Sequence, residues 1–148
     1  MTSMNILIAT AEQEIYRGHA SMIIVTSVDG EIAIMPGHAP LLATLRPGEV
    51  RINCRAETDS SDCNAIDIVV LGGFLEVQPD AIIILADAVE RLEEIDAVKA
   101  QQALEQAKKL LVSSDKAVAV KAMFELELAI ARLSIVRRNS KQSFMKPS

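Results

Sequence analysis

The sequence predicts an all-β N-terminal domain, a sandwich or flattened barrel, followed by a C-terminal antiparallel α-helical hairpin. The first 87 residues contain eight short runs rich in Val, Ile and Leu, most of them bounded by Gly, Pro, Asp or Ser. No helical pattern separates these runs, which favours an antiparallel β architecture over an alternating α/β fold. Beyond residue 96 the apolar residues recur at steps of three and four, as on one face of a helix.

Turn signals divide the β region into its predicted strands. Asp29-Gly30 predicts a hairpin turn, because Gly accepts the positive φ that tight turns require. Pro47-Gly48 and Gly72-Gly73 are interpreted as further breaks between strands. The eight predicted strands span residues 4–9, 21–28, 31–35, 41–45, 49–54, 65–71, 74–78 and 81–87.

Two helices are predicted after the strands. Asp96 is positioned to cap the first, and residues 113–115, Ser-Ser-Asp, interrupt the helical pattern and offer a second cap. The second helix is expected from Lys116 to about Arg138. It carries two apolar stripes, so it is expected to pack on the first helix and on either the sandwich or a partner protein. The members of the stripes are Ala117, Val120, Phe124, Leu128, Ala131 and Ile135, and Ala119, Met123, Leu126, Ile130 and Leu133.

These elements predict three segments. Residues 1–87 form the sandwich, residues 88–138 the helical hairpin, and residues 139–148, which lack any apolar period, a disordered tail. Half of all residues are hydrophobic but only 3% are aromatic, so the core is expected to be aliphatic. The apolar runs are far shorter than the ~20 residues that span a bilayer, so association with a membrane is expected only through a partner.

Charge is distributed unevenly along the chain. The net charge of −5 argues against nucleic acid as a partner. Residues 1–86 contain 4 Lys/Arg and 11 Asp/Glu, whereas residues 87–148 contain 11 Lys/Arg and 9 Asp/Glu. The basic end of the second helix is either a solvated face or a surface that meets an acidic one.

No constellation in the sequence predicts catalysis. The two histidines, His19 and His38, show no metal-binding spacing, and neither a phosphate-binding GxxxxGK[ST] loop nor a GxSxG elbow is present. No catalytic residue and no metal site are therefore predicted. Cys54 and Cys63 are expected to be reduced thiols, with a disulfide that closes the loop between them as the alternative.

Two segments carry a resemblance to a known family. Residues 35–52 contain P-G-H-A-P-L-L followed by a second P-G, and residues 70–87 contain G-G-x-L-E-V-x-P. Together with the helical tail, this order resembles the epsilon subunit of bacterial F-type ATP synthases over roughly residues 5–136. The resemblance implies a non-catalytic rotor subunit of the central stalk.

In that family the sandwich binds the gamma subunit near the c-ring and helps to couple proton-driven rotation to ATP synthesis. The hairpin folds onto the sandwich, or extends along gamma into the alpha/beta hexamer and hinders ATP hydrolysis. The resemblance therefore implies a peripheral protein on the cytoplasmic face of the bacterial inner membrane. Two alternatives are a free-standing nucleotide-sensing protein, whose helices close over a nucleotide, and a cupin-like enzyme, which the missing histidine cluster disfavours.

The resemblance also suggests site residues. Glu31 and His38 match positions near the gamma and c-ring contacts, although His38 could instead bind local backbone in its turn. Arg132, Arg137 and Arg138 are expected to form an inhibitory basic cluster, because the extended hairpin of the family approaches an acidic segment of the beta subunit.

A nucleotide site is suggested only in part. Some family members bind ATP through [IL]-D-x-x-R-A, and Ile95, Asp96 and Ala100 match it, but Lys99 replaces the arginine. Lysine lacks the bidentate fork that arginine offers to phosphate. Arg132 stands where one second-helix arginine is expected, whereas Leu128 replaces another. No cofactor is expected beyond weak ATP binding, with Asp96 serving only as a helix cap as the alternative.

Overall fold

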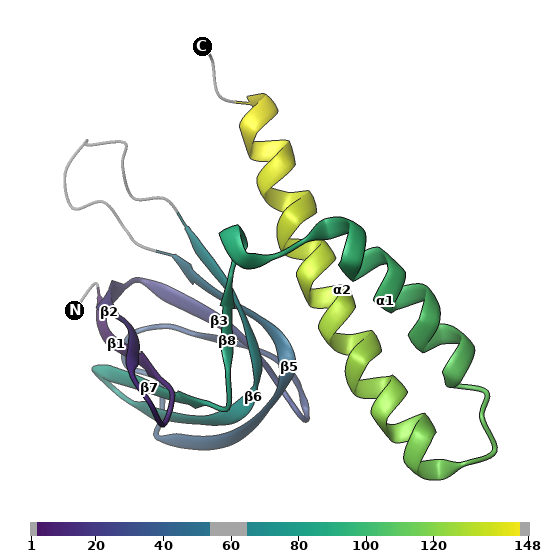
Figure 1. Ribbon diagram of the computed structural model, residues 1–148. Helices are drawn as coiled ribbons and strands as arrows, with labels where there is room; N and C mark the ends of the chain where they lie inside the picture. Colours follow the sequence, from purple (N-terminus) through teal and green to yellow (C-terminus); the bar gives the residue numbers. More distant parts are fainter. Residues whose placement is uncertain (1–2, 54–64, 146–148) are drawn as a thin grey trace.

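A computed structural model of the chain describes residues 3–53 and 65–145. A curled β-sheet forms one body, and a long helical hairpin lies against one side of it (Figure 1). The predicted fold class, a β-sandwich followed by two helices, is confirmed. The strands are β1 (Met4–Ala9), β2 (Glu14–Ala20), β3 (Met22–Ser27), β4 (Gly30–Ile34), β5 (Leu41–Asn53), β6 (Ile66–Gln78), β7 (Ala81–Ala86) and β8 (Val89–Arg91). A 3₁₀ turn (Leu92–Glu94), α1 (Ala97–Leu110) and α2 (Lys116–Met145) follow.

The strands pair in the order β2-β1-β7-β6-β5-β3-β4, and β8 pairs with β6 off this path. All neighbours are antiparallel except β1 and β7, which run parallel. Strands β5 and β6 are each 13 residues long and pair along most of their length. They are the central pair of the sheet, which continues as β7, β1 and β2 on one side and as β3 and β4 on the other.

The breaks predicted at Pro47-Gly48 and Gly72-Gly73 are wrong, because β5 and β6 run through both. These dipeptides lie at the same place along the ladder but are offset in register, because Gly73 pairs with Leu45 whereas Pro47 and Gly48 pair with Leu71 and Val70. Gly72 and Gly73 have φ of 103° and 138°, a backbone region that L side chains rarely adopt. A Cβ on Gly73 would lie 2.2 Å from the carbonyl oxygen of Leu85. The glycines therefore bend the strands without ending them.

This corner changes which side chains face the core. On β5, odd-numbered residues up to Leu45 face inward, and even-numbered residues, Val50 and Ile52, do so afterwards. On β6, Ile68 and Val70 face inward before the corner and Leu75 and Val77 after it. Because successive residues of a strand point to opposite faces, the two halves of the β5–β6 ribbon present different residues to the outside.

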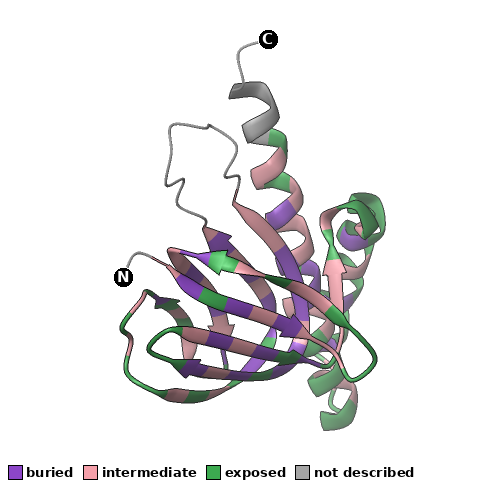
Figure 2. Cartoon of the chain, turned by 90° about the vertical axis from the view of Figure 1, so that its left-hand side faces the viewer, coloured by how far each residue is buried: buried purple, intermediate pink, exposed green. Residues whose placement is uncertain are grey.

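The core is aliphatic, as predicted. Buried and less buried residues alternate along the strands (Figure 2), which is the pattern of a sheet with one face inside. Its most deeply buried side chains belong to Ile, Val, Leu and Met, including Met4, Ile8, Ile23, Ile52, Leu75 and Ile84.

Two strands were not predicted from the sequence. β2 reads Glu-Ile-Tyr-Arg-Gly-His-Ala and lies at the edge of the sheet, so it needs few buried side chains. β8 has only three residues and pairs with Ile68, Val69 and Val70 of β6. The sheet therefore continues past Asp87 to Arg91.

The caps of the hairpin form where the sequence places them. Asp96 Oδ1 accepts hydrogen bonds from the backbone N–H of Val98 at 3.0 Å and of Lys99 at 3.1 Å. Asp115 Oδ1 accepts one from Ala117 N–H at 2.9 Å, at the start of α2. Both carboxylates satisfy N–H groups that have no partner within the helix.

The end of the second helix differs from the prediction. α2 continues to Met145, whereas the sequence predicts an end near Arg138 and a disordered tail from residue 139. No Pro or Gly occurs between residues 139 and 145 to stop the helix. Asn139 and Ser140 donate side-chain hydrogen bonds to the carbonyls of Ile135 and Val136, one turn earlier. A segment without apolar period can therefore continue a helix that is already formed.

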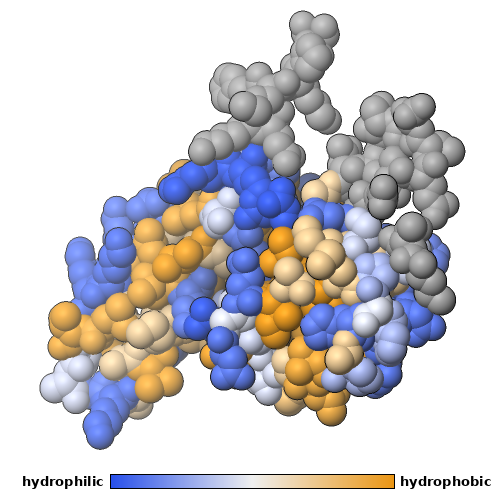
Figure 3. Space-filling view, turned by 180° about the vertical axis from the view of Figure 1, so that it is seen from behind, coloured by the Kyte–Doolittle hydropathy of each residue, from blue (hydrophilic) through white to orange (hydrophobic). Residues whose placement is uncertain are grey.

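Helix α2 packs both on α1 and on the sandwich. Leu128, Ala131 and Ile135 form a buried cluster with Val69 of β6. Ala122 and Ala129 of α2 are buried as well, and so are Ala100 and Ala107 of α1, so small residues line the region where the helices meet. The stripe that faces the sandwich continues beyond it as Phe124 and Val120, which are exposed. Figure 3 shows apolar and polar side chains mixed on this projecting end of the hairpin, at lower left.

Candidate functional site

The junction between α2 and the sandwich contains the densest set of charged contacts in the described chain. Arg132 of α2 binds both carboxylate oxygens of Glu90 in β8, with Nε 2.6 Å from Oε2 and Nη2 paired with Oε1. Each of the two side chains is 23% exposed. A paired fork of this kind fixes the orientation of the helix as well as its position.

A second cluster lies further along α2. Arg138 donates through Nη1 to Asp67 Oδ1 at 2.9 Å and through Nη2 to Glu49. The side chain of Asp67 is 4% exposed, and its Oδ1 also lies 3.7 Å from Nε of Arg51. That nitrogen is buried and makes no hydrogen bond within the described part of the chain. Two cations and two anions from β5, β6 and α2 thus neutralise one another.

The remaining cations near the junction are less involved. Arg46 and Glu127 form a longer pair at 3.8 Å at its edge. Arg137, which lies between the two paired arginines, is exposed and pairs with no carboxylate of the described residues. The predicted basic cluster is therefore divided, with Arg132 and Arg138 bound to the sandwich and Arg137 free.

The carboxylates stabilise the charged form of the two bound guanidinium groups. The hydrogen bond that Arg132 donates to Glu90 raises the pKa of Arg132 above its ordinary value. Burial alone would lower the pKa of Arg138, but the hydrogen bond and charge of Glu49, together with Asp67, outweigh it, and the net shift is upward. Both arginines are consequently cations at any physiological pH.

Apolar contacts complete the junction. Val69, Leu128, Ala131 and Ile135 are buried there, and Leu71, Leu92 and Ile95 pack against them. The ion pairs of Glu90 and of Glu49 flank this cluster. The docked hairpin is held by a small hydrophobic contact with charged contacts beside it.

Of the candidate nucleotide residues, Ile95 and Arg132 belong to this junction, and Asp96 and Lys99 lie at the start of α1. Asp96 caps α1, Arg132 is bound by Glu90, and Leu128 is 3% exposed within the apolar cluster. Ile95 packs against the same cluster, and Lys99 is exposed on the first turn of α1. A phosphate group here would meet one free cation, Lys99, among these residues.

The two candidate rotor-contact residues are not brought together. Glu31 is exposed in β4 and lines a groove under α2 with Arg46 and Glu127. His38 lies in the connection from β4 to β5, where its Nδ1 is 2.7 Å from the carbonyl oxygen of Ala39. The alternative interpretation of His38, a turn histidine bound to local backbone, describes this geometry.

An exposed apolar patch lies on the other half of the β5–β6 ribbon and was not predicted from the sequence. Leu42, Phe74 and Leu85 are 79%, 63% and 56% exposed. Phe74 pairs with Leu85 across the ladder and with Thr44, two residues from Leu42, so the three side chains share one outer face. The signal in the sequence is the run Ala-Ile-Ile-Ile-Leu-Ala of β7, which is apolar on both faces of its strand.

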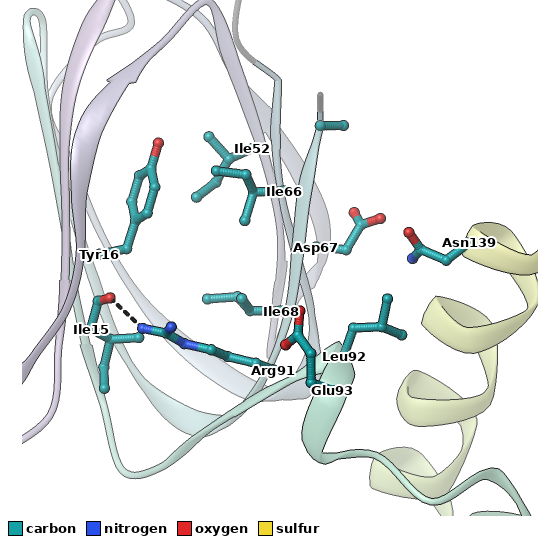
Figure 4. A pocket seen from close by; sticks show the side chains of 11 residues that line it. Ile15, Tyr16, Ile52, Ile66, Asp67, Ile68, Arg91, Leu92, Glu93 and Asn139 are labelled. Atoms are coloured by element: carbon teal, nitrogen blue, oxygen red, sulfur yellow. Dashed lines mark hydrogen bonds between the residues drawn. The ribbon is translucent and has the colours of Figure 1, made fainter. Parts of the chain in front are cut away.

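A cavity of about 450 Å³ opens at the end of the sheet near β2 and β8. Tyr16, Ile52, Ile66 and Ile68 line it, while Asp67 points the other way, toward Asn139 of α2 (Figure 4). Arg91 reaches across it and donates to the carbonyl oxygen of Ile15 at 2.9 Å. Its lining combines these apolar side chains with Asp67, Arg91, Glu93 and Asn139, so it extends from the sheet to α2.

Comparisons with known proteins identify the family. The family model described as "ATP synthase, Delta/Epsilon chain, beta-sandwich domain" matches residues 3–92. The chain is 37% identical to "ATP synthase epsilon chain 2" of Ralstonia nicotianae over 93% of its own length and 96% of the relative. It is 39% identical to "ATP synthase epsilon chain" of Acidithiobacillus ferridurans, over 97% and 98%. The chain belongs to the ATP synthase epsilon family.

The epsilon fold is also found in solved structures. One chain of the mitochondrial ATP synthase of Euglena gracilis superposes with a TM-score of 0.76 at 23% identity, covering 91% of this chain and 81% of that one. A chain from the central stalk and c-ring of the Tetrahymena thermophila enzyme gives a TM-score of 0.54 at 21% identity, covering 95% and 96%. At these identities the likeness concerns the fold.

Further statements concern the described residues only. None of their helices is long and apolar enough to cross a membrane, and they contain no group of three His, Cys, Asp or Glu that could hold a metal ion. Cys54 and Cys63 lie outside the described residues, so neither the reduced thiols nor the alternative disulfide is addressed.

Proposed function

We propose that this epsilon-family chain is a non-catalytic rotor subunit of the ATP synthase central stalk, and that it couples proton-driven rotation to ATP synthesis. Membership of the family supports a stalk subunit over the alternative of a free-standing nucleotide sensor. The observation that carries the proposal is the pair of outer faces on the β5–β6 ribbon. One face holds the hairpin, and the other exposes Leu42, Phe74 and Leu85.

The apolar patch fits a permanent protein partner. Three large side chains more than half exposed on one sheet face are unfavourable in water, and such patches mark interaction sites. The partner that the family resemblance suggests is the gamma subunit. Covering these side chains would leave the hairpin junction on the other half of the ribbon unobstructed.

The two candidate rotor-contact residues are assigned to the part of the sandwich that would face the c-ring. Glu31 and His38 are proposed to lie near gamma and the polar loops of the c-ring, and the exposed carboxylate of Glu31 suits such a contact. The protein would then sit at the cytoplasmic face of the bacterial inner membrane, attached only through the complex. No cofactor is proposed, and ATP would bind at most weakly.

The hairpin is proposed to inhibit ATP hydrolysis when it leaves the sandwich and enters the alpha/beta hexamer. Its docking surface supports this role, because a few apolar side chains and two groups of ion pairs hold it. An interface of this size permits two states separated by a few kcal/mol.

Co-purification with the cognate gamma subunit tests the proposal. Phe74→Glu places a charge in the apolar patch and should abolish co-purification, whereas Thr44→Glu, at the paired exposed position, should weaken it less. Both positions are solvent-exposed, so the melting temperature should change little. Full retention of gamma by the Phe74→Glu variant would contradict this assignment of the patch.

A further inference from the structure

The cavity of about 450 Å³ near β2 and β8 reaches the hydrophobic core of the sandwich. Ile52 and Ile68, which line it, belong to that core, and Ile15, Tyr16 and Ile66 pack against it. Tyr16 lies on one side of the space, with Ile52 and Ile66 on the other (Figure 4). Proteins hold small molecules in apolar cavities of roughly 300–1,000 Å³, and the mouths of closed sheets are one of the usual places. The cavity has the size and the position of a ligand site.

The walls of the cavity determine which part of a ligand can enter it. Ile52 pairs with Ile66 in the ladder between β5 and β6, and Ile68 pairs with Arg91 between β6 and β8. The backbone of these strands is therefore engaged in the sheet, and the isoleucine side chains carry no polar atom. A polar group that left water for this space would lose hydrogen bonds without replacing them, which costs free energy. The buried part of the ligand is accordingly a hydrocarbon.

Arg91 provides a cation at the opening. Its side chain reaches across the cavity and donates through Nη2 to the carbonyl oxygen of Ile15 at 2.9 Å (Figure 4). Glu94 accepts a hydrogen bond from the backbone N–H of Arg91, at 3.2 Å. Among the described residues no carboxylate forms an ion pair with the Arg91 guanidinium. A guanidinium group has several N–H donors and binds carboxylates through charge-assisted, often bidentate, hydrogen bonds.

Two acidic side chains also line the cavity, and neither neutralises Arg91. Asp67 points away from the isoleucine walls, toward Asn139, and its Oδ1 is bound by Arg138 at 2.9 Å (Figure 4). Glu93 is exposed, so water and salt screen its repulsion of an anion. The opening therefore combines an unpaired cation with an apolar interior.

We propose that this cavity binds a small anionic amphiphile. Its hydrocarbon chain lies between Tyr16 and the isoleucines, and its head group binds Arg91. A free medium-chain fatty acid and an anionic membrane lipid both offer this chemistry. Binding requires no other subunit, so the isolated full-length chain is the material for the test.

Titration of the isoleucine methyl signals with sodium octanoate, followed by NMR, tests the site. The signals of Ile15, Ile52, Ile66 and Ile68 should shift and saturate together. Ile130, which is exposed on α2 and does not line the cavity, is the control and should not shift. Affinity should rise about fourfold for each CH₂ group added from hexanoate to octanoate, since each adds buried hydrocarbon. Octanol, which has the same chain and no charge, should bind about tenfold more weakly.

Two variants at the opening test the head-group contact. Arg91→Gln keeps a donor for Ile15 but loses the charge, so octanoate should bind about tenfold more weakly and octanol almost unchanged. Glu93→Gln is the matched control of opposite sign, and it should tighten octanoate binding about twofold by removing a like charge. Thermal melting reports whether each variant is folded. If Arg91→Gln does not fold, the preference for octanoate over octanol, measured in the unmodified chain and in Glu93→Gln, decides the role of charge.

The source of the amphiphile is tested with vesicles of phosphatidylcholine and phosphatidylglycerol in equal amounts. Shifts of the cavity isoleucines with octanoate alone support a free fatty acid, and shifts with vesicles alone support a lipid chain. A site that responds to neither would overturn the proposal, and so would a shift of Ile130 equal to those in the cavity. Equal affinity for octanoate and octanol would overturn the binding of the head group by Arg91.

Discussion

Shortening Leu128 to alanine should release the hairpin without unfolding either body. Leu128 is 3% exposed and packs on Val69 of the sandwich together with Ala131 and Ile135. Leu→Ala changes in cores cost about 2–5 kcal/mol, the smaller values where the surroundings can collapse. The partly exposed Leu71, Leu92 and Ile95 around this cluster allow such collapse, so about 2–3 kcal/mol is expected, or roughly 30- to 150-fold in the docking equilibrium.

The control is Phe124→Ala, one turn earlier on the same stripe of α2. Phe124 is 39% exposed and lies outside the buried cluster, so its truncation should cost below about 1 kcal/mol, within the range of surface substitutions. Hydrogen exchange of α2 amides measures the docking equilibrium, and the amides of β5 and β6 report on the sandwich. Similar acceleration in both variants, or none in Leu128→Ala, would refute the assignment of Leu128 as the main apolar contact.

Three further outcomes are expected. Gly73→Ala should destabilise the sandwich severely, as measured by thermal melting, because its Cβ would lie 2.2 Å from a backbone oxygen; a melting temperature within a few degrees of the unmodified chain would contradict this. Calorimetry should find ATP affinity of about millimolar or weaker, and Lys99→Arg should tighten it only slightly while Glu90 holds Arg132; micromolar binding would be inconsistent with that geometry. A chain ending at Glu94 should melt cooperatively at a higher temperature than one ending at Asp87, which lacks β8; equal stabilities would mean that β8 contributes nothing.

Periodicity and turn chemistry predict most of the fold. Asp96 and Asp115 are capping residues that the sequence identifies correctly, since an N-cap depends on a few neighbouring atoms. The aliphatic strands can be predicted equally well, because buried and less buried residues alternate along them. By contrast, β2 is an edge strand with mostly exposed side chains, so its residues carry no strong pattern. β8 is a strand because it pairs with β6, and the sequence of its three residues alone does not predict that pairing.

The corner of the sheet illustrates a different limit. Gly72-Gly73 has the composition of a turn, and only the partner strand determines whether the chain reverses or bends. The same is true of the candidate site. The sequence predicts a basic cluster at Arg132, Arg137 and Arg138 but cannot show that the acidic β region supplies the cations' partners, because Glu49, Asp67 and Glu90 are far from them along the chain.

The length of α2 has a mechanical consequence. A helix of 30 residues is about 45 Å long, yet among its described side chains those that hold it to the sheet lie between Glu127 and Arg138. The helix is therefore held to the sheet near its middle, and it extends beyond these contacts at both ends. A force applied near either end of α2 would act on these middle contacts with leverage. The departure of the hairpin that the proposed function requires would therefore depend on a handful of local contacts.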